Sequence, residues 1–576
     1  MEKRAIRGHA SQIMVEQLAA SGVKYVFNNS GSREALFFDT LHAHPDIHGI
    51  LGLHEGSVTA MAGGYTQVNA DPGVMVVHLG AGLAQSMGQL INVWWGGLPV
   101  VVITFAGDTG SFADRISLDL SHSFGPTSIA APMTKENWTV VEPEGLPAAI
   151  ERALRVASTP PVGPVHLAVY DSMLGPAPVD TQIIEGSIPE VRAGYPSDDD
   201  MERVALALHE AERPLIYAGD GIWKSGAEAA VTQIAERFGA AVATGMNDLR
   251  GVPIKHPQHV GYFPRAVDAL QPDLILSIGS RHGGAGAASD YDGFGGNAKL
   301  IAIGADVENL KNMPGLDLAV LADERRAMER LAALVQSETT PERYDDRRQW
   351  ARESSTSLRN ERRAALGRTA QEGRVRALPI IDALDSELER LGGGIVTTEQ
   401  VAVPQDVVGG DNGPGNNMYI RPAGGSEGYG GGAPIGAKLA APDKPVVGLV
   451  GDGSLYYADS GLWTAVHHRI PVLYLITNNQ AYGIVAGAFG NAEANMRESG
   501  DYGGVALTGM DPTRIAEGFG MEAVDLTDES KANETIAEGL RIVENERRPF
   551  LINAHMPMGL PEGGRPAQQF RFVDEG

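Results

Sequence analysis

Two short polar motifs follow apolar runs late in the chain, and their residue types are those of a cation site. Gly451-Asp452-Gly453-Ser454 comes directly after Val446–Val450, and Asn478-Asn479 ends the next apolar run. Glycines let a backbone approach an anion closely, while carboxylate and amide oxygens are ligands that Mg²⁺ or Ca²⁺ prefers. Because the carboxyl ends of parallel strands meet at one edge of a sheet, we expect Asp452 and Asn479 to hold a divalent cation that bridges a diphosphate. A Gly-Asp-Gly turn alone is unspecific, but the two motifs at this spacing are much more specific.

The elements that must position these motifs are short β-branched runs that alternate with alanine-rich helical patterns, as is typical of parallel α/β units. A Pro-rich, Gly-rich and acidic stretch, 175–200, interrupts the rhythm, and so does a charged stretch, 337–373, that has the pattern of an exposed helical connector. We therefore predict an α/β protein of three doubly wound parallel-sheet domains, over residues 1–185, 200–336 and 374–560. The predicted strands are Tyr25–Phe27, Val74–His78, Val100–Phe105, Pro214–Ala218, Ala240–Thr244, Leu274–Ile278, Leu300–Ile303, Gly394–Thr397, Val446–Val450, Val472–Thr477 and Phe550–Ala554.

Composition excludes several classes of function. The chain has 576 residues and a formal net charge of −26, which repels nucleic acids and anionic membranes. It has no cysteine, so disulfides, thiolate metal sites and a cysteine nucleophile are excluded. The N-terminus lacks the apolar core of a secretory signal, and the apolar stretches, such as 98–106, are far shorter than the ~20 residues of a membrane span. We expect a cytoplasmic protein that binds neither nucleic acid nor membrane.

The segment from Asp452 to Asn479 resembles the thiamine diphosphate motif of the pyruvate decarboxylase and acetolactate synthase superfamily. In that superfamily a pyrimidine-binding domain, a middle domain and a diphosphate-binding domain follow one another, in agreement with the three predicted units. The resemblance implies thiamine diphosphate as the cofactor, with Mg²⁺ or Ca²⁺ held by Asp452, Asn479 and Ala481. The other implied cofactor-binding residues are Gly451, Gly453, Ser454, Tyr482, Gly483, Ser426 and Gly428.

The same resemblance implies catalytic residues in the first domain. Glu55, in Leu53-His54-Glu55-Gly56, stands where the family has a glutamate that hydrogen-bonds the cofactor's pyrimidine nitrogen and activates the thiazolium. Within the superfamily the benzoylformate decarboxylase branch is most similar: Ser32 matches its serine that contacts the substrate carboxylate, and His78 matches its catalytic histidine. His122 resembles the second histidine of the pair in pyruvate decarboxylases. An imidazole with a pKa near ~6.5 can relay protons near neutral pH.

Several positions depart from these relatives. The stretch 288–292 has no histidine where benzoylformate decarboxylases use one, and Ile484 and Val485 replace the glutamate of pyruvate decarboxylases. In the glycine-rich stretch 423–436, Glu427 stands where the family has a bulky apolar residue that supports the bent cofactor. We expect a substrate pocket that suits an uncharged side chain. Its predicted lining is Ser32, Glu427, Val485, Ala488 and Glu493.

The resemblance therefore implies an enzyme, a thiamine diphosphate- and Mg²⁺-dependent carbon–carbon lyase that decarboxylates a small 2-oxo acid. A 2-hydroxyacyl-CoA lyase or an acetolactate-synthase-like carboligase is the alternative, and a non-catalytic cofactor-binding paralogue is a third reading. The middle domain has Gly219-Asp220-Gly221 and Arg281 in loops at which some relatives bind FAD or ADP, but it lacks the dinucleotide fingerprint, so FAD is not expected. The implied assembly is a homotetramer, with each active site between two subunits.

Overall fold

The computed structural model describes most of the chain and shows where each predicted unit lies. The residues it describes are 2–106, 125–186, 188–189, 191–281, 298–335, 341–367, 372–399, 405–408, 414–492 and 495–567.

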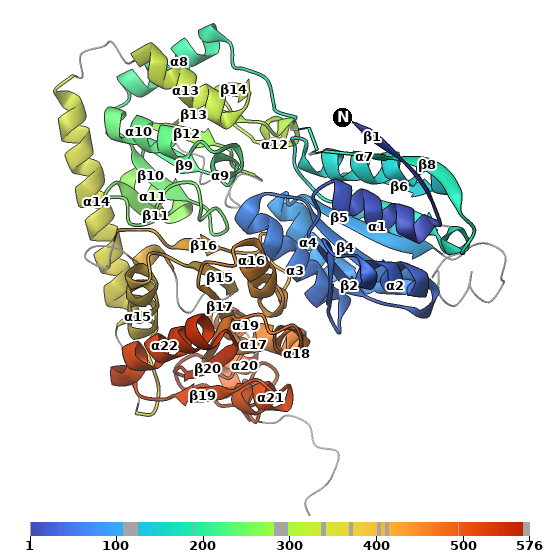
Figure 1. Cartoon of the computed structure of the whole chain (residues 1–576). Helices are drawn as coiled ribbons and strands as arrows, with labels where there is room; N and C mark the ends of the chain where they lie inside the picture. Colours follow the sequence, from blue (N-terminus) through green and yellow to red (C-terminus); the bar gives the residue numbers. More distant parts are fainter. Residues whose placement is uncertain are drawn as a thin grey trace, which may run out of the picture.

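Three six-stranded parallel sheets dominate the described residues, which confirms the predicted α/β class (Figure 1). Their strand orders are β3-β2-β4-β5-β7-β6, β11-β10-β9-β12-β13-β14 and β16-β15-β17-β18-β20-β19. In each sheet the order reverses around an early central strand, so the connecting helices cover both faces, as doubly wound sheets require. The strands are β2 (Tyr25–Asn29), β3 (His48–Leu51), β4 (Gly73–His78), β5 (Val100–Ala106), β6 (Glu136–Val140) and β7 (Val165–Tyr170) in the first sheet, β9 (Pro214–Ala218), β10 (Ala241–Thr244), β11 (His259–Tyr262), β12 (Leu274–Ile278), β13 (Lys299–Gly304) and β14 (Leu318–Leu321) in the second, and β15 (Ile395–Glu399), β16 (Met418–Ile420), β17 (Val446–Gly451), β18 (Leu473–Asn478), β19 (Ala523–Leu526) and β20 (Phe550–His555) in the third.

Helices flank the sheets and supply the turns that carry the polar motifs. They are α1 (Ala10–Ala20), α2 (Ala35–Ala43), α3 (Glu55–Asn69), α4 (Leu79–Gly96), α6 (Gly125–Ala130) and α7 (Leu146–Ser158) around the first sheet, α8 (Asp198–Glu210), α9 (Gly221–Ser225), α10 (Glu228–Phe238), α11 (Phe263–Leu270), α12 (Val307–Asn312) and α13 (Glu324–Val335) around the second, and α15 (Ala377–Arg390), α16 (Ala433–Ala440), α17 (Asp452–Ala458), α18 (Ser460–His467), α19 (Gly483–Asn491), α20 (Asn495–Ser499), α21 (Pro512–Gly518) and α22 (Ala532–Arg541) around the third.

The first and third sheets share one hydrophobic core, because helices from both pack between them. Helices α3 and α16 approach so closely that a Cβ on Gly64 would overlap the backbone of Ala433, and one on Gly436 would overlap the backbone of Met61. This contact accounts for two of the glycines in 423–436, Gly432, whose Cβ would overlap Ser57 of α3, and Gly436. Helix α3 of the first domain and helix α16 of the third domain are therefore in direct backbone contact.

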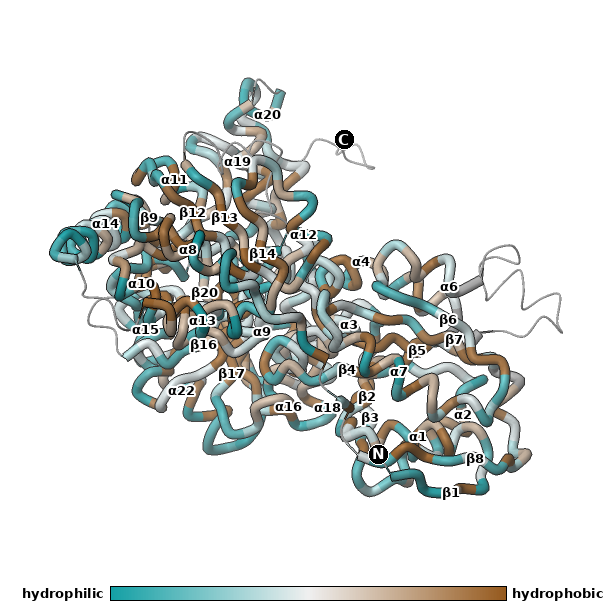
Figure 2. Tube along the Cα trace, turned by 90° about the horizontal axis from the view of Figure 1, so that it is seen from above, coloured by the Kyte–Doolittle hydropathy of each residue, from teal (hydrophilic) through white to brown (hydrophobic). Residues whose placement is uncertain are grey.

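Two connecting segments join the domains. Helix α14 (Arg343–Leu366) is the predicted exposed connector, and Figure 2 shows it as largely hydrophilic. The stretch 175–200 is more ordered than an open linker: β8 (Val179–Ile184) pairs antiparallel with β1 (Lys3–Gly8). Its acidic cluster is the first turn of α8, where Ser197 caps the helix and the carboxylates favour the positive helix end.

None of the helices that the structure describes is long and apolar enough to cross a membrane.

Candidate active site

The predicted site residues fall into two groups, each at the carboxyl edge of one sheet. In the first sheet, β3, β2 and β4 are neighbours, and the segments after them carry Glu55, Ser32 and His78. In the third sheet, β15, β17 and β18 are neighbours, and the turns after β17 and β18 carry Asp452 and Asn479. The fold therefore assembles each group from segments that lie apart in the sequence.

Asp452 begins helix α17 directly after β17 and is 2% exposed. Its Oδ2 accepts a hydrogen bond from the N–H of Gln480, 2.9 Å away in the turn after β18. Burial raises the pKa of Asp452 to about 6, despite backbone N–H groups that lower it. No lysine or arginine among the described residues forms an ion pair with this carboxylate. A carboxylate in such a position would be stabilised by a bound cation.

Asn479 and Ala481 form the other wall of this turn. The side-chain Oδ1 of Asn479 accepts from the N–H of Ala481 at 3.1 Å, and the carbonyl of Ala481 accepts from Gly483 at 2.9 Å. A Cβ on Gly559 would lie 2.8 Å from the Asn479 amide, so only glycine fits there. The described residues contain no cluster of three or more acidic or histidine side chains that could hold a metal alone. The donor set instead fits a cation that also takes oxygens from a bound diphosphate.

The glycine-rich loop lies against this turn and is fixed by α4. Asn92 donates to the carbonyl of Ser426 at 2.7 Å, and Gln89 donates to the carbonyl of Glu427 at 2.6 Å. Gly428 has a φ of +99°, a conformation that favours glycine. The carboxylate of Glu427 accepts a hydrogen bond from the hydroxyl of Ser454. Glu427, which replaces an apolar residue, thus contacts the turn expected to hold the diphosphate.

Glu55 is the first residue of α3 and is 7% exposed. Its side chain has no hydrogen-bond or ion-pair partner among the described residues. A Cβ on Gly82 of α4 would lie 3.1 Å from its Oε1, so the carboxylate packs against a glycine. A buried carboxyl group without a protein partner fits a role in binding a ligand.

His78 ends β4 and pairs with a carboxylate that the sequence interpretation did not include. Its Nδ1 lies 2.7 and 2.9 Å from the two carboxylate oxygens of Glu34, which is 1% exposed. The hydrogen bond to Glu34 raises the pKa of His78, although burial opposes this. Glu34 occupies Nδ1, so Nε2 is the ring nitrogen left for a substrate. The sequence offered one signal for this pairing: Glu34 is an acidic residue in the segment after β2, the strand next to β4.

The loop that carries Ser32 lies against the same imidazole. A Cβ on Gly31 would overlap the ring of His78, so glycine is required for this contact. Ser32 begins a short 3₁₀ helix (Ser32–Glu34) and is exposed. The structure therefore brings Ser32, Glu34 and His78 together, and the charge of Glu55 lies near enough to act on His78.

The remaining predicted residues divide into two sets. Val485 and Ala488 lie on an exposed apolar face of α19, together with Ile484 and Phe489. His122 and Glu493 lie outside the described residues. In the described part of one chain, no hydrogen bond or ion pair joins the group of Glu55, Ser32 and His78 to that of Asp452 and Asn479.

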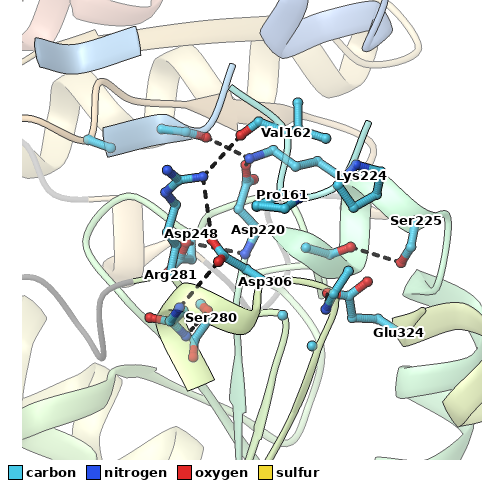
Figure 3. A pocket seen from close by; sticks show the side chains of 18 of the residues that line it. Pro161, Val162, Asp220, Lys224, Ser225, Asp248, Ser280, Arg281, Asp306 and Glu324 are labelled. Atoms are coloured by element: carbon cyan, nitrogen blue, oxygen red, sulfur yellow. Dashed lines mark hydrogen bonds and ion pairs between the residues drawn. The ribbon is translucent and has the colours of Figure 1, made fainter. Parts of the chain in front are cut away.

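The middle domain carries a second Gly-Asp-Gly turn, at the crevice shown in Figure 3. Asp220 in this turn is bound by the guanidinium of Arg250, with 2.8 Å between Nε and Oδ1, and by Lys224 at 3.2 Å. Burial alone would raise the pKa of Asp220, but the charges of Arg250 and Lys224 outweigh it and lower the pKa. Arg281 lies between the carbonyl of Val162 and the carboxylate of Asp306 (Figure 3).

The glycines of this turn are explained by packing within the protein. A Cβ on Gly219 would overlap the backbone of Ser280, and Gly221 donates to the carbonyl of Gly279 at 2.9 Å. The carboxylate of Glu324 also reaches this point: it accepts from the N–H of Ala305 at 3.0 Å and would lie 2.8 Å from a Cβ on Gly221. The place at which a glycine turn could receive a phosphate is thus filled by another turn and a carboxylate.

Comparison with known proteins matches all three units to one family. Residues 8–122 match the N-terminal TPP binding domain of thiamine pyrophosphate enzymes, residues 201–331 their central domain, and residues 412–554 their C-terminal TPP binding domain.

Individual relatives cover nearly the whole chain. The benzoylformate decarboxylase of Pseudomonas aeruginosa is 28% identical, over 93% of this chain and 97% of its own length. The acetolactate synthase isozyme 3 large subunit of Escherichia coli is 23% identical, over 94% of each chain. Among solved structures, the thiamine diphosphate-dependent 4-hydroxybenzoylformate decarboxylase of Rhodococcus jostii RHA1 superposes with a TM-score of 0.75 at 25% identity, covering 96% of this chain and 99% of its own. The chain belongs to the thiamine pyrophosphate enzyme family.

Proposed function

We propose that the protein is a thiamine diphosphate- and Mg²⁺-dependent carbon–carbon lyase that decarboxylates a 2-oxo acid to an aldehyde. The observation that carries this proposal is the buried carboxylate of Glu55, which has no hydrogen-bond or ion-pair partner among the described residues and whose charge acts on the imidazole of His78. The similarity to a benzoylformate decarboxylase over nearly the full length supports the choice of reaction. When bound, thiamine diphosphate supplies the electron sink for the electrons that carbon dioxide leaves behind.

Each residue of the first group has a separate task in this proposal. Glu55 hydrogen-bonds the pyrimidine ring of the cofactor through its carboxylate. Ser32 donates its hydroxyl to the substrate carboxylate, from an exposed position beside His78. His78 transfers a proton at Nε2, because Nδ1 is bound to Glu34, and Glu34 keeps the ring in one orientation. His122 is the second proposed proton carrier, on the strength of the resemblance alone.

The second group holds the diphosphate end of the cofactor. Asp452, Asn479 and the carbonyl of Ala481 are the proposed ligands of Mg²⁺. The backbone of Gly451 and Gly453 and the hydroxyl of Ser454 would hold the diphosphate. For this the carboxylate of Glu427 must leave Ser454, because two anions would otherwise compete for one hydroxyl. The other proposed cofactor contacts are Ser426, Gly428, Tyr482 and Gly483.

We further propose that a second copy of the chain completes each site. Among the described residues of one chain no hydrogen bond or ion pair joins the two groups, and the apolar face of α19 with Val485 and Ala488 is exposed. A dimer is then the minimal active unit and a homotetramer the expected assembly. Light scattering after size exclusion tests this proposal, and an active monomer contradicts it.

The middle-domain crevice is not proposed as a flavin site. Glu324 and the turn of Gly279 and Ser280 fill the place beside Gly221, and a diphosphate there would face a carboxylate. An absorption spectrum of the purified protein tests this point. A flavin band that is retained through purification contradicts it.

The reaction is tested by carbon dioxide release from protein loaded with thiamine diphosphate and Mg²⁺. The substrate panel runs from pyruvate through branched 2-oxo acids to benzoylformate. We expect release with one class and a loss of about 100-fold or more in Glu55→Gln, with Glu142→Gln, an exposed residue, as the matched control. Unchanged turnover in Glu55→Gln would refute the mechanism.

A silent panel with confirmed cofactor binding would favour the second candidate, a carboligase or 2-hydroxyacyl-CoA lyase. The similarity to acetolactate synthases supports the carboligase form. Calorimetry with free CoA separates the two, because only the CoA lyase requires CoA to bind. Cofactor binding without turnover on any substrate is the result expected of a non-catalytic paralogue.

A further inference from the structure

A cavity of about 330 Å³ lies beside the glycine-rich loop, between the third sheet, the end of α4 and a loop of the middle domain. Its walls include Trp95, Met246 and Ile484, which are apolar, and its charged members are Arg421, Glu399 and Glu427. Among the described residues of this lining, Arg421 is the only cationic one. The cavity is therefore apolar on one side and carries a positive charge on the other.

Both carboxylates in the cavity already have partners. Glu399, at the end of β15, accepts from the N–H groups of Tyr429, at 2.8 Å, and Gly430. Glu427 accepts from Ser454. Burial, together with the charge of Glu427, raises the pKa of Glu399 to about 8, so this group is largely uncharged at neutral pH. Both carboxylates act on Arg421 through their charge, but neither forms an ion pair with it among the described residues.

Arg421 itself lacks an ionic partner in the part of the chain that the structure describes. Its backbone is fixed, because its carbonyl accepts from Gln67 at 2.9 Å. Burial lowers the pKa of its guanidinium, and the charges of Glu427 and Glu399 oppose that change. Arginine shielded from water is normally paired with an anion, and its planar N–H groups match a carboxylate. An unpaired arginine at the rim of a substrate-sized cavity fits an anion that arrives with a ligand.

We propose that Arg421 binds an acidic group on the side chain of the substrate, so that the preferred substrate is a 2-oxo acid with a second carboxylate. This inference rests on the proposed function, in which Ser32 receives the carboxylate next to the oxo group. Arg421 lines the same cavity as Glu427, a predicted residue of the substrate pocket, and Ile484. The apolar walls suit the methylene groups between the two acids. The sequence pattern predicts an uncharged substrate side chain because Val485 and Ala488 are apolar. That prediction did not include the charge of Arg421.

The test compares two ligands of similar size, 2-oxoglutarate and 2-oxohexanoate, by calorimetry and by the fluorescence of Trp95. Wild-type protein loaded with thiamine diphosphate and Mg²⁺ is expected to bind the diacid about 10- to 100-fold more tightly. Arg421→Gln should lose this preference, and Arg421→Lys should keep part of it. In turnover, KM for the diacid should rise in Arg421→Gln while kcat changes little.

Arg281→Gln is the matched control, because Arg281 lines the neighbouring middle-domain crevice, which Arg421 also lines, but does not line this cavity. It should keep the preference for the diacid. The proposal is overturned if wild-type protein binds both acids equally or if folded Arg421→Gln keeps the preference. It is also overturned if Arg281→Gln alone loses the preference, since the anion would then bind in the crevice. A diacid preference without carbon dioxide release would leave Arg421 as the anion site and refute the decarboxylase instead.

Discussion

The chain contains two Gly-Asp-Gly turns, each after a central strand of a parallel sheet, and they differ in what neutralises the aspartate. After β9, Asp220 is held by Arg250 and Lys224, and its pKa is lowered by them against the effect of burial. After β17, Asp452 has no such cation, and burial raises its pKa to about 6. The same three residues therefore form a closed ion network in one domain and an open acceptor in the other.

A Gly-Asp-Gly turn therefore predicts a metal-cation site only where no arginine or lysine side chain of the protein pairs with its aspartate. The glycines of the two turns also differ in what they pack against. Those around Asp220 allow two protein turns to touch, whereas Gly453 packs against the ring of Tyr482, with 3.0 Å to the position of a Cβ. The turn after β17 thus remains available for a ligand.

The largest expected effect is on cofactor retention in Asp452→Asn. Loss of the charged ligand should weaken binding of Mg²⁺ and thiamine diphosphate by more than ~100-fold, because even indirect contacts to a metal contribute 10- to 100-fold. Removal of Mg²⁺ with EDTA should release the cofactor from the wild type in the same way. Equilibrium dialysis measures both, and retention of the cofactor by Asp452→Asn contradicts the comparison.

Asp220→Asn should have the opposite profile. It leaves Arg250 and Lys224 without their counter-charge in a mostly buried place, which typically costs about 3–5 kcal/mol of stability. Hydrogen exchange of the middle domain should therefore become much faster. Cofactor binding, measured on protein that is still folded at low temperature, should stay within a factor of ~3. A loss of cofactor comparable to that of Asp452→Asn would show that the two turns are not separate in function.

The dependence of middle-domain stability on pH should come partly from Glu324. Burial raises the pKa of Glu324 to about 7 from 4.5, so its stabilising contribution is present at low pH and is lost as pH rises from about 4.5 to 7. The shift corresponds to roughly 3 kcal/mol. Hydrogen exchange should show this decline in wild-type protein and a flatter profile in Glu324→Gln. The exposed Glu329→Gln on the same helix is the control, and an equal flattening there would refute the assignment.

The smallest effect is expected in Glu34→Gln, which removes the charge that raises the pKa of His78. The pKa of His78 should fall, so any activity that needs the imidazolium should be lost at a lower pH than in the wild type. NMR titration of the ring measures the shift directly. Glu34→Asp should restore part of it, and a pKa that is unchanged in Glu34→Gln would remove Glu34 from the positioning role.

The sequence predicts the centres of the sheets better than their edges. All eleven predicted strands are strands in the structure, and their buried apolar runs explain why. None of the six edge strands of these sheets was predicted. Of these, β3, β14 and β19 have only four residues each and are partly exposed, so each contributes few buried apolar residues to the sequence pattern. The interior strand β7 was also absent from the prediction, and its apolar run is interrupted by the fully buried His166.

The sequence predicted site residues where a motif lies within one turn and missed candidate partners that come from separate strands. Asp452 and Asn479 were found because each follows a strand in a recognisable motif. Glu34 and Arg421 have no motif: one is identified by its distance to His78, and the other by a cavity that three domains form. Likewise, sequence could not show that Asp220 is neutralised by Arg250, which lies 30 residues further along the chain.

The most direct test of the central claim is a crystal structure with thiamine diphosphate and Mn²⁺ in place of Mg²⁺, in which anomalous scattering locates the metal. The account predicts one strong peak per chain, bound by Asp452, Asn479 and the diphosphate, and no peak at Asp220. A peak at Asp220, or bound cofactor with no metal at Asp452, would contradict it.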